Sequence, residues 1–186
     1  MRRKRRRFGP RGGRSSLEHI CDELAASVQR VKTKMCRRHA GPIDAPPMLF
    51  HRLDGDDELR MTEFPYGHPV TVFPLIWERI LDEGNPDFVA VVTESYMRPH
   101  RDGEVYRRGQ YERDFKENPS SDVKEVVLIA GVDLRRGRYR NTVIPFSYDD
   151  RGMPRFTRYP WSNHCTGNLG EILADCARQM QQRMGW

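Results

Sequence analysis

The sequence lacks any apolar run near the ~20 residues that a transmembrane helix needs. Its basic first residues are followed by Gly-Pro-Arg-Gly-Gly-Arg rather than by the apolar stretch of a secretory signal. We therefore expect no membrane partner and a cytoplasmic location. If the protein is eukaryotic or binds a chromosome, we expect it in the nucleus or the nucleoid instead. The 186 residues suit one domain, and a hydrophobic share of 37% allows a modest core.

The short motifs of common enzyme classes are also missing. The absence of a Walker loop, GxGxxG, HExxH or GxSxG argues against nucleotide, zinc-protease and serine-hydrolase sites. Cys21 and Cys176 fall on apolar helical stripes, as expected for small core residues in a reducing compartment. Adjacent His164 and Cys165 have no identifiable third group to complete a nucleophilic site. We expect no cofactor and no metal site, and we favour a non-enzymatic protein.

Positive charge is concentrated at the start of the chain. The sequence has 32 Lys and Arg against 26 Asp and Glu, a formal net charge of +6. Residues 1–14 contain eight cations and no acid: Arg2, Arg3, Lys4, Arg5, Arg6, Arg7, Arg11 and Arg14. Without them, 24 basic residues face 26 acidic ones, a net charge of −2. Because these residues repel one another and have few apolar neighbours, we predict a disordered arm that neutralises phosphates.

Three segments show helical spacing. Apolar residues from Leu17 to Met35 predict an amphipathic helix, with Ser15 and Glu18 as its capping box and Gly41-Pro42 as its end. A second helix is predicted over 70–81, with Pro74 in its first turn, where the missing N–H is harmless. A last helix is predicted after Asn168, which can serve as its N-cap.

Six segments carry strand patterns: 48–53, 58–64, 88–98, 123–134, 139–148 and 153–159. The third begins with apolar residues on both faces, which is typical of a central strand covered on both sides. Short glycine-containing turns join the last three strands into a meander. We therefore predict an α+β domain over residues 15–186, with an antiparallel-rich sheet, a C-terminal β-meander and N-terminal, middle and C-terminal helices packed on it. The long connection at 99–122 is a candidate binding loop, lid or insert, with room for a short helix around Tyr111 and Phe115.

A second basic region surrounds the turn between segments 123–134 and 139–148. It contains Arg135, Arg136, Arg138 and Arg140, and aromatic residues interleave with further arginines up to residue 161. Sheets hold single strands through such cations and stacking rings, although strand aromatics also pack in cores. We interpret these four arginines as nucleic-acid-binding residues that act with the arm.

Glu94 is an acid within an apolar strand. Pro86-Asp87 and Glu94-Ser95-Tyr96 partly match the PD…ExK pattern of metal-dependent nucleases, but Tyr96 stands where lysine is needed. A separation of seven also places Asp87 and Glu94 on opposite faces of one strand. We interpret Asp87 as a turn residue and Glu94 as a salt-bridge partner or strand end. Two cross-strand acids, Glu125 and Asp133, lie on a neighbour whose register the sequence does not fix.

These observations predict a non-enzymatic accessory protein that contacts DNA or RNA without sequence specificity, through the arm and the basic turn. The alternative is a protein-interaction or regulatory domain with an incidental charged leader, whose partner is another protein. A metal-dependent hydrolase or nuclease that uses Glu94 with acids across the sheet is the third interpretation.

Overall fold

The computed structural model describes residues 5–7, 16–64, 69–97, 110–118, 122–157, 160–164 and 167–186. Helices pack on an antiparallel sheet in an α+β arrangement, which confirms the predicted fold class. In chain order the elements are β1 (Arg5–Arg7), α1 (Leu17–His39), β2 (Met48–Leu53), β3 (Glu58–Glu63), α2 (Pro69–Glu83), β4 (Pro86–Met97), α3 (Gln110–Glu117), β5 (Lys124–Asp133), β6 (Arg138–Tyr148), β7 (Pro154–Phe156) and α4 (Gly167–Met184).

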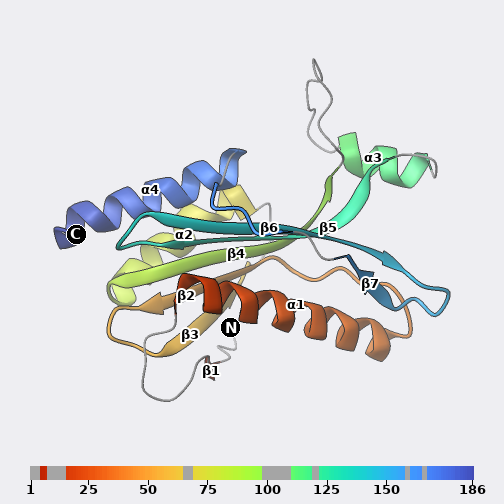
Figure 1. The fold of residues 1–186 in the computed structure, drawn as a ribbon, viewed down its shortest axis with the longest axis horizontal. Helices are drawn as coiled ribbons and strands as arrows, with labels where there is room; N and C mark the ends of the chain where they lie inside the picture. Colours follow the sequence, from red (N-terminus) through yellow and green to blue (C-terminus); the bar gives the residue numbers. More distant parts are fainter. Residues whose placement is uncertain are drawn as a thin grey trace.

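The strands form one sheet in the order β1-β3-β2-β4-β5-β6-β7 (Figure 1). All neighbouring strands are antiparallel, and β5, β6 and β7 form the predicted meander. The sequence predicts no strand within the basic arm, yet Arg5–Arg7 pair with β3 as an edge strand. The remaining residues of the arm, 1–4 and 8–14, lie outside the described residues.

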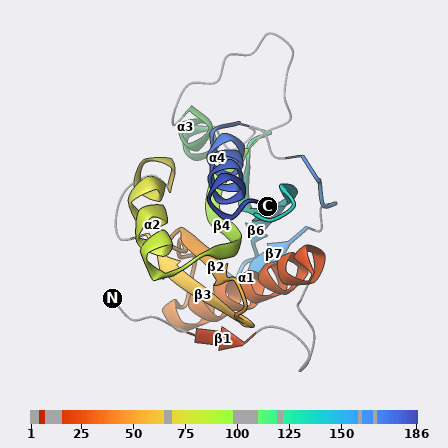
Figure 2. The ribbon, with the colours of Figure 1, turned by 90° about the vertical axis from the view of Figure 1, so that its left-hand side faces the viewer.

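Helices cover both faces of the sheet (Figures 1 and 2). Phe88, Ala90 and Val92 of β4 belong to the core beneath α1. Val89 and Val91 alternate with them and belong to the core shared with α2 and α4. Burying a large apolar side chain contributes ~1.5–3 kcal/mol, so a strand that is apolar on both faces is stable only between two such layers. The predicted central strand is therefore confirmed.

The N-cap of helix α1 is one residue later than predicted, at Ser16 rather than Ser15. Ser16 is the N-cap, and its Oγ accepts a hydrogen bond of 3.2 Å from the His19 N–H. Ala40 ends the helix in the left-handed conformation, with φ of 54°. Gly131 of β5 lets α1 approach closely, because a Cβ there would lie 3.2 Å from the Cys21 sulfur.

Helix α2 extends beyond its predicted bounds at both ends. Because it begins at Pro69, Pro74 lies inside the helix rather than in its first turn, which corrects the prediction. Trp77 lies on the buried side of α2, and its indole N–H donates a 2.6 Å hydrogen bond to Gln179 Oε1 of α4. None of the helices, in the part of the chain that the structure describes, is long and apolar enough to cross a membrane.

Helix α3 occupies part of the long predicted connection, where a short helix was expected. The Tyr96 and Phe115 rings lie 5.2 Å apart, which places α3 against the end of β4. Residues 98–109 and 119–121 of this connection lie outside the described residues.

Candidate functional site

Three of the four arginines predicted at the β5–β6 turn form ion pairs with carboxylates from other elements. Arg135 pairs with Asp54 of the β2–β3 turn and lies over the Trp186 ring at 4.8 Å. Arg138 lies 2.6 Å from Glu18 and Arg140 lies 3.4 Å from Asp22, both acids of α1. Arg136 is exposed and forms no ion pair with the described part of the chain. Three of the four cations therefore stand beside negative charge.

The aromatic residues near this turn belong largely to the core. Phe146 is buried under α1, and Tyr148, Phe156 and Trp161 pack against the same cluster. Tyr139 packs on the opposite face with α2 and α4. The ring of Trp161 also covers the Arg140 guanidinium at 4.7 Å. These rings therefore pack in or against the core, as strand aromatics commonly do, rather than forming a separate stacking surface.

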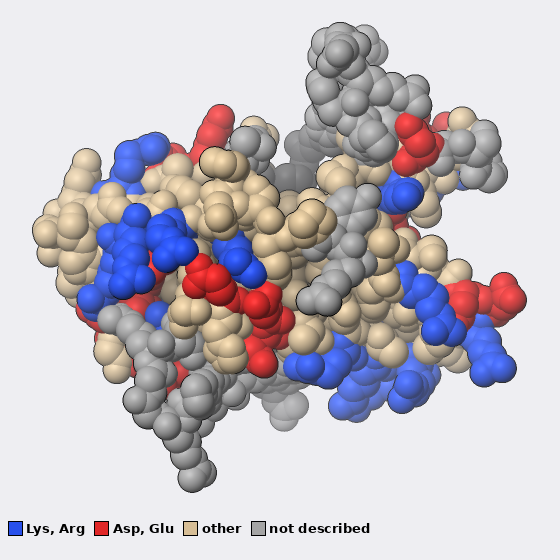
Figure 3. Space-filling model, viewed as in Figure 1, with Lys and Arg blue, Asp and Glu red and all other residues tan. Residues whose placement is uncertain are grey.

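A different basic surface lies on the C-terminal half of α1 (Figure 3). A shallow groove runs between α1 and Phe156 of β7, and no acidic residue lines it. Its cations are exposed and form no ion pair among the described residues: Arg30, Lys34, Arg37 and Arg38. We call these four residues the α1 basic face. The sequence signal for it is the absence of acids on α1 after Glu23.

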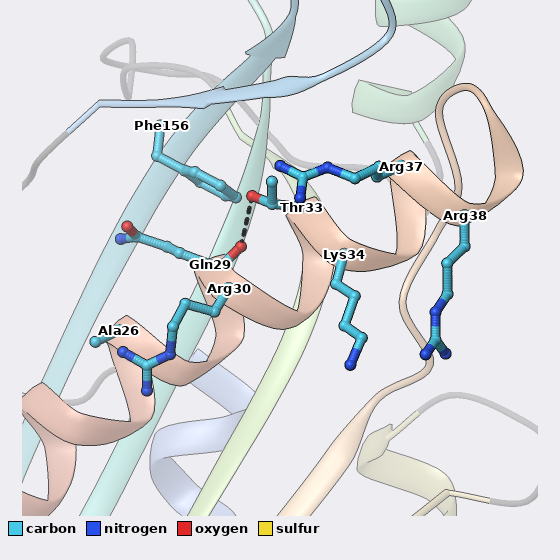
Figure 4. A pocket seen from close by; sticks show the side chains of 8 residues that line it. All are labelled: Ala26, Gln29, Arg30, Thr33, Lys34, Arg37, Arg38 and Phe156. Carbon is cyan, nitrogen blue, oxygen red and sulfur yellow. Dashed lines mark hydrogen bonds between the residues drawn. The ribbon is translucent and has the colours of Figure 1, made fainter.

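On the α1 side of the groove, the lining residues form two rows with a spacing of four (Figure 4). Arg30, Lys34 and Arg38 form one row, with steps of ~6 Å along the helix axis. Gln29, Thr33 and Arg37 form the second row, of which Thr33 lies nearest to Phe156 in the view. Thr33 Oγ1 donates a 2.8 Å hydrogen bond to the Gln29 carbonyl within the helix. The groove thus combines positive charge, polar side chains and one half-buried ring.

Beneath the same half of α1 lies a fully buried ammonium group. Lys32 Nζ donates hydrogen bonds of 2.7 Å to Glu94 Oε2 of β4 and 2.7 Å to the Ile43 carbonyl. The Phe146 and Tyr148 rings lie 4.7 Å and 5.5 Å from it. Burial lowers the pKa of Lys32, but its interactions with Glu94 and Tyr148 together outweigh burial and raise the pKa. The salt-bridge interpretation of Glu94 is confirmed.

Glu94 belongs to a cluster of three carboxylates. One oxygen each of Asp44, Glu94 and Glu125 lie within 4.8 Å of one another. We call these residues the acidic cluster. Asp44 comes from the exposed loop after α1, and Glu125 comes from β5 opposite Tyr96. Burial raises the pKa of Glu94, against the influence of Lys32, and burial raises the pKa of Glu125 to about 7.

Sequence reasoning did not identify Lys32 or Asp44 as part of this buried polar region. Lys32 follows Val28 and precedes Cys36 on the buried stripe of α1, and a lysine on such a stripe usually directs its charge outward. Asp44 lies in a proline-rich loop with no periodicity. Asp133, the other cross-strand acid considered, lies opposite Phe88 at the far end of β5 and accepts hydrogen bonds from the Arg135 and Arg136 N–H groups.

Asp87 is a strand residue rather than the predicted turn residue. It is buried in β4 and accepts two hydrogen bonds from Arg52, of 2.9 Å and 3.1 Å. This bidentate pair neutralises Asp87. Asp87 and Glu94, the two acids of the partial PD…ExK match, therefore do not form a common site. His164 is exposed, whereas Cys165 lies outside the described residues.

The buried cysteines fit their predicted core role. Cys21 and Cys176 are 0% and 3% exposed, and burial raises the pKa of each thiol to about 12. Thiols held in this protonated form are poor nucleophiles. Comparison with known protein families, with curated proteins and with solved structures finds no match to this chain.

Proposed function

We propose that the protein contacts nucleic acid without sequence specificity, through the α1 basic face together with the N-terminal arm. The observation that carries this proposal is the groove beside Phe156, which has four exposed cations and no acid among its lining residues. Phosphates are attracted to such a surface chiefly by release of counterions, which requires no particular base sequence.

Helix electrostatics alone do not account for this charge. Cations near a helix C-terminus are stabilised by the macrodipole, but the effect falls off within the last turn. Arg37 and Arg38 are in the last turn of α1, whereas Arg30 and Lys34 precede it. Arg30 and Lys34 therefore extend the positive surface beyond the last turn, where the helix macrodipole no longer stabilises cations.

The groove also offers contacts that a single strand can use. Gln29 and Thr33 present polar groups beside the cations, and Phe156 is half-buried at the opposite wall. Aromatic side chains stack on bases regardless of their identity, with ~1–3 kcal/mol per stacked base. We therefore favour a single-stranded ligand over a duplex for this groove.

Salt-dependent binding tests the proposal. Fluorescence anisotropy with a labelled single-stranded oligonucleotide is measured over a KCl series for the wild type and for Arg30→Gln/Lys34→Gln/Arg37→Gln/Arg38→Gln. Each phosphate contact on a single strand contributes about −0.7 to the slope of log K against log salt, so the variant slope should be shallower by up to ~3.

A matched control removes exposed charge elsewhere. Arg113 of α3 and Arg183 of α4 are exposed cations outside the groove. Arg113→Gln/Arg183→Gln should therefore lower the net charge while leaving most of the slope in place. Circular dichroism verifies that all the variants fold. Equal slopes for the wild type and the four-residue variant would refute the proposal.

A further inference from the structure

The acidic cluster lies where three elements meet under the second half of α1. Glu94 stands opposite Val127, and Tyr96 stands opposite Glu125, so Glu94 and Glu125 are diagonal neighbours on one face of the sheet. That face is the one covered by α1, as the shared core of Val92 and Val127 shows. Asp44 reaches the same point from the loop that follows α1.

The charges in this place do not balance. Three carboxylates converge, while one ammonium group, that of Lys32, forms an ion pair with Glu94. Lys32 is engaged by Glu94 Oε2 and the Ile43 carbonyl. Glu94 Oε1 is buried and has no hydrogen bond of ordinary geometry among the described residues, although the nearby Ala45 N–H lowers the pKa of Glu94. A buried carboxylate oxygen with no partner is costly, because it has lost its hydration.

Glu125 is a second acid of the cluster that lacks a protein partner. Its side chain belongs to a residue that is 8% exposed, and within the described ranges it has no hydrogen bond or ion pair. One of its oxygens lies within 4.8 Å of the ligand oxygens of both Asp44 and Glu94. Glu125 is thus an unpartnered, buried acid directed at the cluster, which is the arrangement expected of a ligand side chain whose partner is an ion.

The spacing and the chemistry of the donors specify the class of ion. Oxygens bound to one hard cation lie ~2.0–2.6 Å from it, so they lie at most ~4–5 Å from one another. The cluster offers only carboxylate oxygens, which favour Mg²⁺, Mn²⁺ or Ca²⁺ over zinc, for which cysteine and histidine are typical ligands.

We propose that Asp44, Glu94 and Glu125 bind one divalent cation of this hard class, with water completing its coordination. Lys32 holds Glu94 in place through Oε2 and leaves Oε1 for the cation. This site is separate from the α1 basic face, and its occupation does not depend on nucleic acid.

Mn²⁺ binding to the full chain tests the proposal directly. Chelator-treated protein without nucleic acid is titrated with Mn²⁺, and the free ion is followed by electron paramagnetic resonance. We expect one Mn²⁺ per chain, and at least about tenfold weaker binding for Asp44→Asn and for Glu125→Gln, since even changes to the groups that orient metal ligands typically cost 10–100-fold. Competition by Mg²⁺ and Ca²⁺ shows whether the site takes this class of ion.

The variants are chosen so that folding does not obscure the result. Asp44 is exposed in a loop, so Asp44→Asn should leave the fold intact. Asp57→Asn, an exposed acid in the β2–β3 turn, is the matched control and should bind as the wild type does. Absence of Mn²⁺ binding, or equal binding by the wild type and both cluster variants, would overturn the proposal.

Discussion

Replacing Glu125 with glutamine should stabilise the fold at pH 8 and stabilise it much less at pH 5. Glutamine keeps the shape of the side chain but cannot ionise. In the folded protein, burial raises the pKa of Glu125 from 4.5 to about 7. The carboxylate is therefore harder to form in the folded state than in the unfolded chain, and ionisation favours unfolding.

The magnitude follows from proton linkage. Below the unfolded pKa of 4.5, Glu125 is protonated in both states and does not affect the pH dependence. Between that value and about 7 the unfolded chain releases its proton first, so the free energy of unfolding falls as pH rises. A difference of ~2.5 pKa units at ~1.36 kcal/mol per unit gives a cost of roughly 3 kcal/mol, which is complete above pH ~7.

Other ionisable groups around Glu125 also contribute to the total pH dependence. Lys32 of α1, Glu94 of β4, Asp44 of the preceding loop and Lys116 of α3 all act on it electrostatically. Glu94 has a raised pKa as well and is present in both the wild type and the variant. The difference between Glu125→Gln and the wild type cancels most of these shared contributions.

Urea unfolding followed by circular dichroism at pH 5, 6, 7 and 8 measures this difference, at constant ionic strength and with a chelator present. The gain in unfolding free energy should grow from about 1 kcal/mol at pH 5 to roughly 3 kcal/mol at pH 8. As the control, Glu63→Gln alters an exposed residue at the end of β3 and should change stability by less than ~0.5 kcal/mol throughout. A difference that stays constant from pH 5 to pH 8 would refute the reasoning.

Two further predictions concern the buried ion pair and the arm. Glu94→Gln should destabilise the fold by about 3 kcal/mol, because Lys32 is 0% exposed and would keep an uncompensated charge, whereas Glu94→Gln/Lys32→Met should recover most of the loss. Urea unfolding at pH 7 checks this, and a single variant as stable as the wild type would contradict it. Deleting residues 1–14 should make the salt dependence of oligonucleotide binding shallower, because eight cations are removed. Filter binding over a salt series measures it, and an unchanged slope would count against the arm.

The fold was predictable where one stretch of sequence decides the structure. The apolar stripe of α1 and the continuous apolar run of β4 predict their own burial, since their spacing fixes which faces must be covered. The short turns before β6 and β7 likewise determine antiparallel neighbours. Pairing of β1 with β3 was not predictable, because an all-arginine segment carries no apolar pattern and its register depends on a partner over fifty residues away.

The acidic cluster was predictable only in part. Strand parity correctly places Glu94 on the face of Ala90 and Val92, and the sequence names Glu125 as a cross-strand acid. Whether the two acids meet depends on the register of β4 against β5. The hydrophobic cores on both faces of the sheet determine this register, and no local sequence motif indicates it. Lys32 and Asp44 join them through the rotation of α1 and the path of its loop, both of which are consequences of tertiary packing.

Charge along the sequence also differs from charge on the surface, and α1 shows why. The acids of its first half, Glu18 and Asp22, pair with Arg138 and Arg140, which lie 120 and 118 residues away. These pairs reduce the free positive charge of the β5–β6 turn, whose arginines look like a phosphate site when they are counted along the chain. The second half of α1 has no acids, and its exposed cations, Arg30 and Lys34 among them, form no ion pair with a carboxylate in the described ranges. Since long-range pairing decides which cations remain available to phosphate, the α1 basic face is the surface on which the nucleic-acid proposal depends.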